Sequence, residues 1–578
     1  MRGMEKRTGA ALAASVLLAF ICGFLVYRTM GFVYAIADDV IMRDIASGAF
    51  TGTPDGHLIF MQYGLGWIIS RCYLLNSQVD WYGFFLAGAL FLALAAVLYR
   101  GLAADWSKKA KLCYSVCALG LFLTALVFHA AQFEWTISAA ALATAALYLY
   151  LSAGTEKALS ATEQILIWLL LVLTYGIRYD VFFMALPGFG IGFLWKTVKR
   201  QGGHLQFAWP QLLLPVLVFA CVGGLFVTEK LAYSGTQWAE FQRFQTARSD
   251  VYDYYGVPSY EADPVFFEEE GLSDAEVRNL RHYALYLVDG MDAERMESLS
   301  AEAKLQSSRQ TGMKARLKNG VILAAGQMRD LSYGTVSIPA VLVLAATLFL
   351  AARYRKERLL PILLFVAAEG FLWLALGFLG RLPERVAISM HLVTLGGGAG
   401  FCVELWQGLA DESRKKKVFA RSGAALGLVL MAAGLWQWKD SIQSNREKLS
   451  MDASFQQFKN ECKADTESLY FIETYMAEPV GGAVVTAKGD FRLNRCLTLG
   501  DWYTTSPLDT ERFEALDIQS VEQTLLENPH AYLVVRDVAD PGFLESYFTG
   551  KYPDRELILA ETRETGGRLY YLYQVAEK

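Results

Sequence analysis

The sequence predicts a mainly α-helical, polytopic membrane protein that ends in a small extracytoplasmic α/β or α+β domain. Three observations predict this fold class: 54% of the 578 residues are hydrophobic, only 19% are charged, and long apolar runs recur as far as residue 438. A helix needs roughly 20 apolar residues to cross a bilayer. The formal net charge of −5 provides no broad basic surface, so nucleic acid is excluded as a partner.

The first two apolar runs fix the orientation, because short cytoplasmic loops are rich in Lys and Arg. Arg2, Lys6 and Arg7 precede the first run, residues 10–37, which places the amino terminus in the cytoplasm. The second run, residues 57–75, would carry every later basic loop to the outer side if it crossed the membrane. It also contains Gln, Gly and Arg, so we predict a re-entrant or interfacial helix in the first outer loop.

The remaining runs then give about eleven crossings, with each basic cluster in the cytoplasm. The first run is treated as an uncleaved helix. A signal peptide ending at Ala35-Ile36-Ala37 is the alternative, but the run is too long for a signal core and Arg28 interrupts it. The predicted spans cover residues 10–37, 81–99, 112–129, 135–152, 163–178, 180–197, 211–229, 337–352, 359–378, 388–407 and 419–438.

Two extramembrane regions complete the predicted organisation. Residues 1–438 form the transmembrane domain, which includes a helical outer loop at 232–334, where Ser273 to Glu276 has the pattern of a helix start. Residues 439–578 form the extracytoplasmic domain, in which four short β-rich runs alternate with helical and turn sequence. These runs are residues 483–487, 532–535, 557–560 and 569–575. Cys462 and Cys496 lie in this polar region and can pair if their geometry permits it.

Ionisable residues gather in the predicted outer loops, close to the membrane. Such groups are costly to place at membrane depth, so each is a functional candidate. Arg381 and Arg385 run against the positive-inside trend, and an anionic ligand accounts for cations kept outside. The acidic pair Asp38-Asp39 is the most informative feature, because it begins the first outer loop. The candidate site residues are Asp38, Asp39, His57, Arg178, Asp180, Arg381, Glu384 and Arg385.

This layout resembles the GT-C superfamily of integral-membrane glycosyltransferases, and is closest to its bacterial members. The matching elements, over about residues 10–438, are the loop beginning Asp38-Asp39, its interfacial helix, the many spans and the soluble outer tail. The resemblance implies an inverting hexosyl- or pentosyltransferase in the bacterial cytoplasmic membrane, with an Asp base. The partners that the resemblance implies are a polyprenyl-phosphate-linked sugar donor, a glycan, lipid or protein acceptor, and the membrane lipids around the protein.

The residues suit this chemistry. A carboxylate, Asp38 or Asp39, removes the acceptor proton, and the second carboxylate raises the pKa of the first. Arg178, Arg381 and Arg385 stabilise the departing phosphate through planar bidentate contacts. His57 contacts phosphate or, with the acidic pair, helps to hold an optional Mg²⁺ or Mn²⁺ ion.

Simpler roles for the same residues stay open. Asp38-Asp39 can serve a helix terminus, while Arg178 with Asp180, and Glu384 with its neighbouring arginines, can form structural ion pairs. Two other functions also compete. One is a flippase or transporter for a lipid-linked glycan, which would keep its charges deep between helices. The other is a non-catalytic membrane anchor that presents the outer domain.

Overall fold

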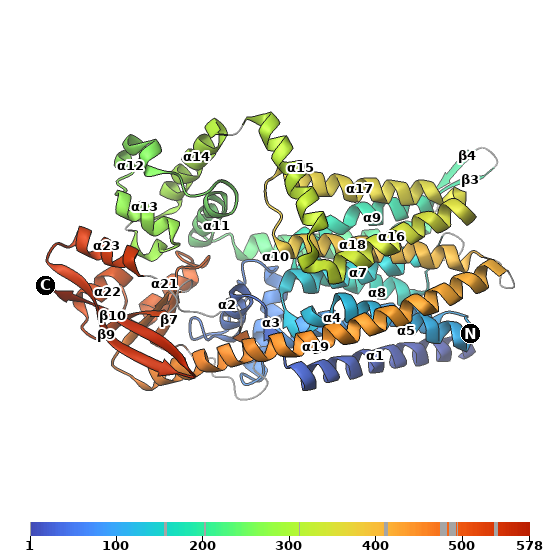
Figure 1. The fold of residues 1–578 in the computed structure, drawn as a ribbon, viewed down its shortest axis with the longest axis horizontal. Helices are drawn as coiled ribbons and strands as arrows, with labels where there is room; N and C mark the ends of the chain where they lie inside the picture. Colours follow the sequence, from blue (N-terminus) through green and yellow to red (C-terminus); the bar gives the residue numbers. More distant parts are fainter. Residues whose placement is uncertain are drawn as a thin grey trace.

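The computed structural model describes residues 2–154, 159–201, 204–207, 209–288, 290–310, 312–409, 414–473, 482–484, 493, 495–536 and 541–578. A bundle of long helices occupies one part of the molecule (Figure 1). Two smaller parts, one helical and one built on a β-sheet, lie together beyond one end of the bundle (Figure 1). The predicted fold class, a helical membrane domain followed by a small α/β domain, is confirmed.

The bundle has a helix at each of the eleven predicted positions. Seven stretches of the described chain are long and apolar enough to cross a membrane: α1, α4, α7, α10, α17, α18 and the stretch 313–354. Helices α5, α8, α9 and α19 pack beside them. The bundle helices are α1 (Arg2–Met30), α4 (Trp81–Ala103), α5 (Lys108–Ala125), α7 (Trp135–Ser152), α8 (Ala161–Ile177), α9 (Tyr179–Thr197), α10 (Leu213–Ala232), α16 (Gly334–Tyr354), α17 (Leu359–Phe378), α18 (Glu384–Gln407) and α19 (Arg414–Ala464).

The first span is shorter than predicted. Helix α1 ends at Met30 because Gly31 adopts a φ of 77°, and its N–H closes on the carbonyl of Tyr27 at 2.9 Å. A left-handed glycine commonly ends a helix in this way. The chain then forms strand β1 (Val33–Tyr34) and a separate helix, α2 (Ala37–Ser47). The single run expected over residues 10–37 is therefore wrong, and the acidic pair lies in the first turn of α2.

Helix α3 (Tyr63–Leu75) is the helix expected in the first outer loop. Its 13 residues extend about 20 Å, less than the roughly 30 Å of hydrocarbon that a span must cross. Trp67, Ile68 and Leu75 are exposed on its surface. The length and this apolar face fit a helix that lies in the membrane interface.

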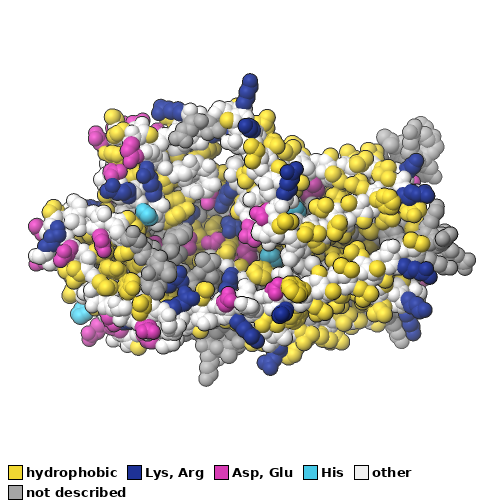
Figure 2. All heavy atoms as spheres, in the orientation of Figure 1, with side chains coloured by type: hydrophobic (Ala, Val, Ile, Leu, Met, Phe, Trp, Pro, Cys, Tyr) yellow, Lys and Arg dark blue, Asp and Glu magenta, His cyan; other side chains and the backbone are white. Residues whose placement is uncertain are grey.

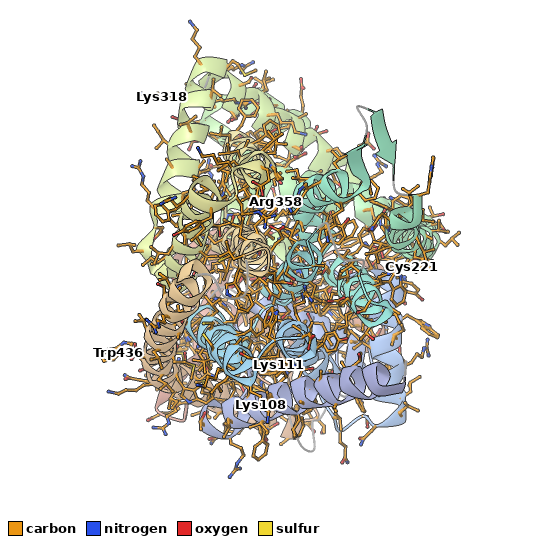
Figure 3. All side chains as sticks on the ribbon, turned by 90° about the vertical axis from the view of Figure 1, so that its right-hand side faces the viewer. Lys108, Lys111, Cys221, Lys318, Arg358 and Trp436 are labelled. Atoms are coloured by element: carbon orange, nitrogen blue, oxygen red, sulfur yellow. The ribbon has the colours of Figure 1, made fainter. Side chains whose placement is uncertain are left out.

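The two ends of the bundle differ in charge. Figure 2 shows a continuous hydrophobic surface over the bundle, with Lys and Arg side chains gathered at the right-hand end. This end, here called the basic end, also holds the amino terminus (Figure 1). Viewed from that side, it presents Lys108, Lys111 and Arg358 (Figure 3). The two extramembrane parts cover the opposite end, here called the domain end (Figure 1).

Helix α7 forms the centre of the bundle and is almost completely buried. It packs against α18, α8, α4 and α9. Glycines of α18 allow the closest approach: a Cβ at Gly396 would lie 2.6 Å from the carbonyl oxygen of Thr144, and one at Gly400 would lie 2.8 Å from the Cβ of Leu151. Small residues at such crossings let helices pack closely within a membrane.

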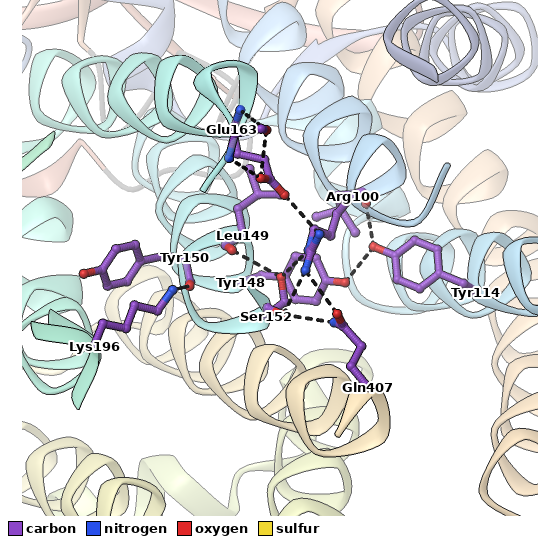
Figure 4. A network of polar contacts seen from close by, with 11 residues as sticks. Arg100, Tyr114, Tyr148, Leu149, Tyr150, Ser152, Glu163, Lys196 and Gln407 are labelled. Carbon is purple, nitrogen blue, oxygen red and sulfur yellow. Dashed lines mark hydrogen bonds and ion pairs between the residues drawn. The ribbon is translucent and has the colours of Figure 1, made fainter. Parts of the chain in front are cut away.

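A buried polar network joins α4, α7, α8 and α18 (Figure 4). Arg100 of α4 pairs with Glu163 of α8 at 3.0 Å and donates to the hydroxyl and carbonyl of Ser152 in α7, at 3.0 Å each. Gln407 of α18 donates to the same carbonyl at 3.0 Å. Because both charges are nearly buried, the pair depends on these added bonds.

We expect Arg100→Met to lower the free energy of unfolding by about 3 kcal/mol, because Glu163 would keep a buried charge without its partner. Unfolding of the purified protein in mixed micelles measures the change. The double variant Arg100→Met/Glu163→Gln is the control and should recover part of the loss. Equal losses in the single and double variants would contradict this assignment.

The part at the domain end that follows α10 is helical. It has its own core, which includes Phe244, Phe267, Val277 and Met296. The predicted helix start at Ser273 is a complete capping box with Glu276. Its elements are α11 (Thr236–Ser249), η2 (Asp250–Tyr255), η3 (Tyr260–Ala262), α12 (Pro264–Glu269), α13 (Asp274–Arg281), η4 (Leu285–Leu287) and α14 (Ala293–Gln310).

Helix α15 (Met313–Arg329) departs from the expectation of an outer loop that continues to residue 334. It returns to the bundle and packs against α17, where a Cβ at Gly320 would lie 2.9 Å from the carbonyl oxygen of Gly377. The remaining short elements connect the bundle helices. They are α6 (Val127–Ala131), β3 (Val198–Gln201), β4 (His204–Phe207), η1 (Trp209–Leu212), η5 (Leu331–Tyr333) and η6 (Lys356–Arg358).

The carboxyl-terminal domain is built on a five-stranded sheet with the order β7-β5-β8-β10-β9. Strands β5, β7 and β8 are parallel, and β10 runs antiparallel to both of its neighbours. The predicted strands at 532–535, 557–560 and 569–575 are confirmed, while residues 485–487 lie outside the described residues. The elements are β5 (Leu469–Glu473), β7 (Cys496–Leu499), α21 (Pro507–Ala515), α22 (Val521–Glu527), β8 (Ala531–Arg536), α23 (Gly542–Lys551), β9 (Arg555–Thr565) and β10 (Arg568–Glu577).

Helix α19 crosses the predicted boundary between residues 438 and 439 without a break. It runs for 51 residues from the basic end into the carboxyl-terminal domain (Figure 1). The polar residues beyond 438 extend the helix because they keep its period and contain no Pro or Gly before Ala464.

Candidate active site at the domain end

A short three-stranded sheet brings the acidic residues together. Strand β1 pairs in parallel with β2 (Gln132–Phe133) and antiparallel with β6 (Gly482–Ala483) of the carboxyl-terminal domain. The N–H of Ala35 also donates to the carbonyl of Phe133 at 2.6 Å. Parallel strands end at the same edge of a sheet, so Asp38, which follows β1, and Glu134, which follows β2, leave this sheet together.

Side chains of α19 hold both strands in place. Asn445, which is fully buried, donates to the carbonyl of Gly31 at 3.3 Å and to that of Ala131 at 3.2 Å. Lys448 donates to the carbonyl of Ala35 at 3.2 Å. The extension of α19 beyond the bundle therefore positions the two loops that carry the acids.

We expect Asn445→Ala to lower the free energy of unfolding by about 1–3 kcal/mol, because two buried carbonyls lose their donor. Activity should fall with it, since the loops carrying the acids lose a support. Denaturant unfolding and an activity assay measure the two effects. Gln443→Ala is the matched control, because Gln443 is exposed two residues away and bonds only Glu447 in the described structure. An Asn445 variant as stable as this control would refute the assignment.

Asp39 is the buried member of the acidic pair. It has no exposed surface, and the hydroxyl of Tyr82 donates to its Oδ1 at 2.7 Å. Burial, followed by the charge of Glu134, raises the pKa of Asp39 well above its usual range. Burial raises the pKa of Glu134 as well, although Arg385 opposes the shift. Asp39 therefore favours its protonated form.

Asp38 faces cations instead. Burial raises its pKa, but the charges of Arg385, Arg248 and Arg178 all lower it. The indole of Trp502 approaches it closely enough to act in the same direction. These three arginines come from the start of α18, the end of α11 and the junction of α8 with α9. The pKa of Asp38 therefore stays above its usual range, but these cations make Asp38 easier to ionise than Asp39, whose pKa is raised well above its usual range.

Aromatic rings form a wall beside these charges. The guanidiniums of Arg178 and Arg385 lie 5.6 and 5.3 Å from the ring centroid of Trp135. Phe60 stacks on Trp135 at 5.6 Å and meets Trp502 edge-on at 4.7 Å. Packing of this kind restricts the side chains and fixes the directions of the two guanidiniums.

Several buried polar atoms in this cluster have no hydrogen-bond partner among the described residues. They come from an acid, two indoles and a guanidinium, so both an acceptor and donors are unsatisfied. Buried groups in this state are costly unless a ligand or water pairs with them. The atoms are Asp39 Oδ2, Trp135 Nε1, Arg248 Nε and Trp502 Nε1.

Of the predicted site residues, Arg178 and Arg385 lie in the cluster with the acidic pair, whereas the others have different contacts. Arg178 also pairs with Asp180 at 2.9 Å. Arg381 pairs with Asp253 of η2 at 2.9 Å and lies over Tyr254, so it links α18 to the helical part. Glu384 is exposed at the start of α18.

His57 occupies a separate aromatic pocket. Its Nδ1 lies 2.7 Å from Asp55 Oδ1, and its Nε2 lies 3.3 Å from the carbonyl oxygen of Ala232. Its ring stacks on Trp238 at 4.3 Å. Through these contacts both ring nitrogens face oxygen atoms that can accept a hydrogen bond. They tie the first outer loop to the junction of α10 with α11.

Three members of the cluster were missed by the sequence interpretation. Glu134, Arg248 and Trp502 were not among the candidate site residues. Strands β1 and β2 have two residues each, which is too short to predict from a pattern. Arg248 lies in a polar helix without a distinguishing motif.

The acidic pair does not fit the metal ion considered from the sequence. Across the described ranges, no group of three or more His, Cys, Asp or Glu side chains is arranged to hold a metal. Three guanidiniums act on Asp38, and Asp39 favours its protonated form. Mg²⁺ and Mn²⁺ require ionised oxygen ligands, and nearby cations oppose their binding.

A cavity of about 280 Å³ lies inside the bundle and holds none of the predicted site residues. Helices α4, α5, α7, α18 and α19 line it with an almost wholly apolar surface. Cys113, Cys117 and Cys402 are among its wall residues. The charged groups of the candidate site lie apart from this cavity.

Two crystal structures of ArnT from Cupriavidus metallidurans are similar to this chain. The apo structure has a TM-score of 0.39 and 12% sequence identity, over 97% of this chain and 98% of that chain. The structure bound to undecaprenyl phosphate has a TM-score of 0.41 and 13% identity, over 96% of this chain and 97% of that chain. No family model and no curated protein matches the sequence. At these TM-scores, the function rests on the geometry of the site itself.

Proposed function

We propose that the protein is a membrane glycosyltransferase that uses a polyprenyl-phosphate-linked sugar on the extracytoplasmic face. The observation that carries this proposal is the meeting of Asp38, Asp39 and Glu134 with Arg178, Arg248 and Arg385 at the domain end. A carboxylate beside three cations can accept a proton from a hydroxyl while the cations bind a phosphate. The acceptor is a glycan, lipid or protein hydroxyl of the cell envelope.

Asp38 is the base in this proposal. As it takes the acceptor proton, the acceptor oxygen forms a bond to the anomeric carbon, and the bond from that carbon to the phosphate oxygen breaks. Attack from the face opposite the phosphate inverts the anomeric configuration. The leaving polyprenyl phosphate gains charge, which the planar guanidiniums of Arg178, Arg248 and Arg385 neutralise.

Asp39 and Glu134 position the base rather than exchange protons with substrate. Asp39 is fully buried and held by Tyr82, and its carboxyl favours the neutral form beside Glu134. If Asp39 and Glu134 were both ionised beside Asp38, their negative charges would repel the leaving phosphate. Protonation of Asp39 reduces that repulsion and leaves Asp38 as the ionised group.

The location of the site suits a lipid-linked donor. Helix α2, whose first turn carries the acidic pair, lies where the bundle meets the two smaller parts (Figure 1). A phosphate at this level can keep its polyprenyl chain among the bundle helices. In this proposal the basic end faces the cytoplasm, as the positive-inside rule favours, and the site faces the other side of the membrane.

Vesicles containing the purified protein and a radiolabelled polyprenyl-phosphate sugar test the function. Transfer predicts release of polyprenyl phosphate and labelled acceptor, both lost in Asp38→Asn. Movement of intact donor across the bilayer without cleavage would support the flippase alternative. Cells that carry Asp38→Asn/Asp39→Asn and keep an unchanged surface glycan profile would support the non-catalytic anchor.

A further inference from the structure

The end of α19 meets the sheet of the carboxyl-terminal domain at two cysteines. Cys462 lies in the last turn of α19 and is 0% exposed, and Cys496 begins β7 and is 7% exposed. Both belong to one core cluster with Phe458, Tyr470 and Ile472. Their thiols hydrogen-bond to each other, so two segments far apart in sequence bring their sulfurs into contact.

The surroundings of this pair favour cross-linking during folding. The Cys496 hydrogen bond and burial raise the pKa of Cys462, while nearby Arg563 opposes the shift. Arg563 also donates to Cys462 Sγ at 3.6 Å. The thiolate is the reactive form, so the buried thiols are slow to react once the domain has folded. Oxidation is therefore fastest while the segments are still assembling.

We propose that Cys462 and Cys496 form a disulfide in the mature protein, which rests on the extracytoplasmic placement of this domain in the proposed function. The thiolate of one cysteine attacks the disulfide of an extracytoplasmic thiol oxidase and forms a mixed disulfide. The second thiolate then displaces the enzyme sulfur. One S–S bond forms in the chain, and the oxidase disulfide takes up the two electrons and two protons that the cysteines lose and becomes a dithiol.

The cross-link closes the loop that reaches the candidate site. Between β5 and β7 in the sequence, the described residues 482–484 include β6, which pairs with β1 beside α2. Val484 follows β6, donates its N–H to the carbonyl of Phe32 at 3.0 Å, and is buried in the bundle core. A disulfide at Cys496 fixes the returning end of this loop to α19. The bond thus restrains a segment that supports the acidic pair.

The chain supplies a matched control pair. Cys113 and Cys117 of α5 also contact each other, but they lie in the wall of the apolar cavity within the bundle. A thiol oxidase in the aqueous phase does not reach that position. The proposal therefore requires a disulfide in one contacting pair and free thiols in the other.

Alkylation followed by mass spectrometry tests the proposal. Cells are quenched with N-ethylmaleimide in SDS, and the unreduced protein is digested with trypsin. We expect peptide 460–463 linked to peptide 496–512, while Cys113 and Cys117 carry the alkyl group. Reduction should release both peptides. Alkylated Cys462 and Cys496 in the unreduced protein would overturn the proposal.

A stability measurement gives a second readout. Reducing agent should lower the unfolding temperature of the wild type to that of Cys462→Ala/Cys496→Ala and leave the variant unchanged. Reducing agent should lower the unfolding temperature of Cys113→Ala/Cys117→Ala by as much as it lowers that of the wild type. An equal response in the wild type and the Cys462/Cys496 variant would reject the cross-link. A linked pair in a protein without sugar transfer would reject the proposed function and keep the disulfide.

Discussion

Replacing Asp38 with Asn is expected to reduce turnover by about 10²–10⁴-fold, the range associated with loss of a general base. The amide keeps the size of the side chain but cannot accept the acceptor proton. Binding of the donor should change little, because Arg178, Arg248 and Arg385 remain. Initial rates over a range of donor concentrations separate the loss in kcat from any change in KM.

Asp80→Asn is the matched control for Asp38→Asn. Asp80 is also a buried carboxyl, but it accepts hydrogen bonds from Tyr34 and Tyr73 and caps α4. Its variant should lose stability and keep its turnover per folded molecule within about threefold. If Asp38→Asn were as active as Asp80→Asn, Asp38 would not be the base.

Replacing Arg385 with Gln should lower kcat/KM by about 10²–10³-fold, because the leaving phosphate loses a guanidinium already aligned beside Trp135. Lys at this position keeps the charge but loses the planar pair of donors. We therefore expect Arg385→Lys to fall between the wild type and Arg385→Gln. Equal activity in all three forms would remove Arg385 from the phosphate site.

The pH profile of the Arg385 variants provides an independent test. Asp38 must be ionised to accept a proton, so the rate falls when the pH drops through its pKa. Burial raises this pKa, and Arg385 opposes that effect together with Arg248 and Arg178. Without Arg385 the pKa of Asp38 rises further, and the acid limb of kcat/KM moves to higher pH. Arg385→Lys should leave the limb close to its wild-type position.

Hydropathy and charge were enough to predict the membrane domain. The lengths of the apolar runs and the basic loops located its helices, because bilayer thickness and insertion rules act on local composition. The end of the first span was not visible in this way. Residues 31–37 remain apolar, and only the conformation of Gly31 and the pairing of β1 separate α1 from α2.

The candidate site was predicted in part. Asp38 and Arg385 were found because ionisable residues near a membrane need a specific reason. The contributions of Glu134, Arg248 and Trp502 depend on tertiary contacts: a pairing of two-residue strands, a helix of the outer part, and a loop of the carboxyl-terminal domain. Such long-range packing leaves no local pattern in a single sequence.

Helix α19 is uninterrupted and about 76 Å long, from its 51 residues at 1.5 Å each. Each residue also advances the helix by about 100°. The number of residues in α19 therefore sets how the carboxyl-terminal domain is rotated about the helix axis relative to the bundle. One added residue between Trp438 and Asn445 would swing Asn445 away from Gly31 and Ala131, so selection acts on the length of this segment as well as on its composition.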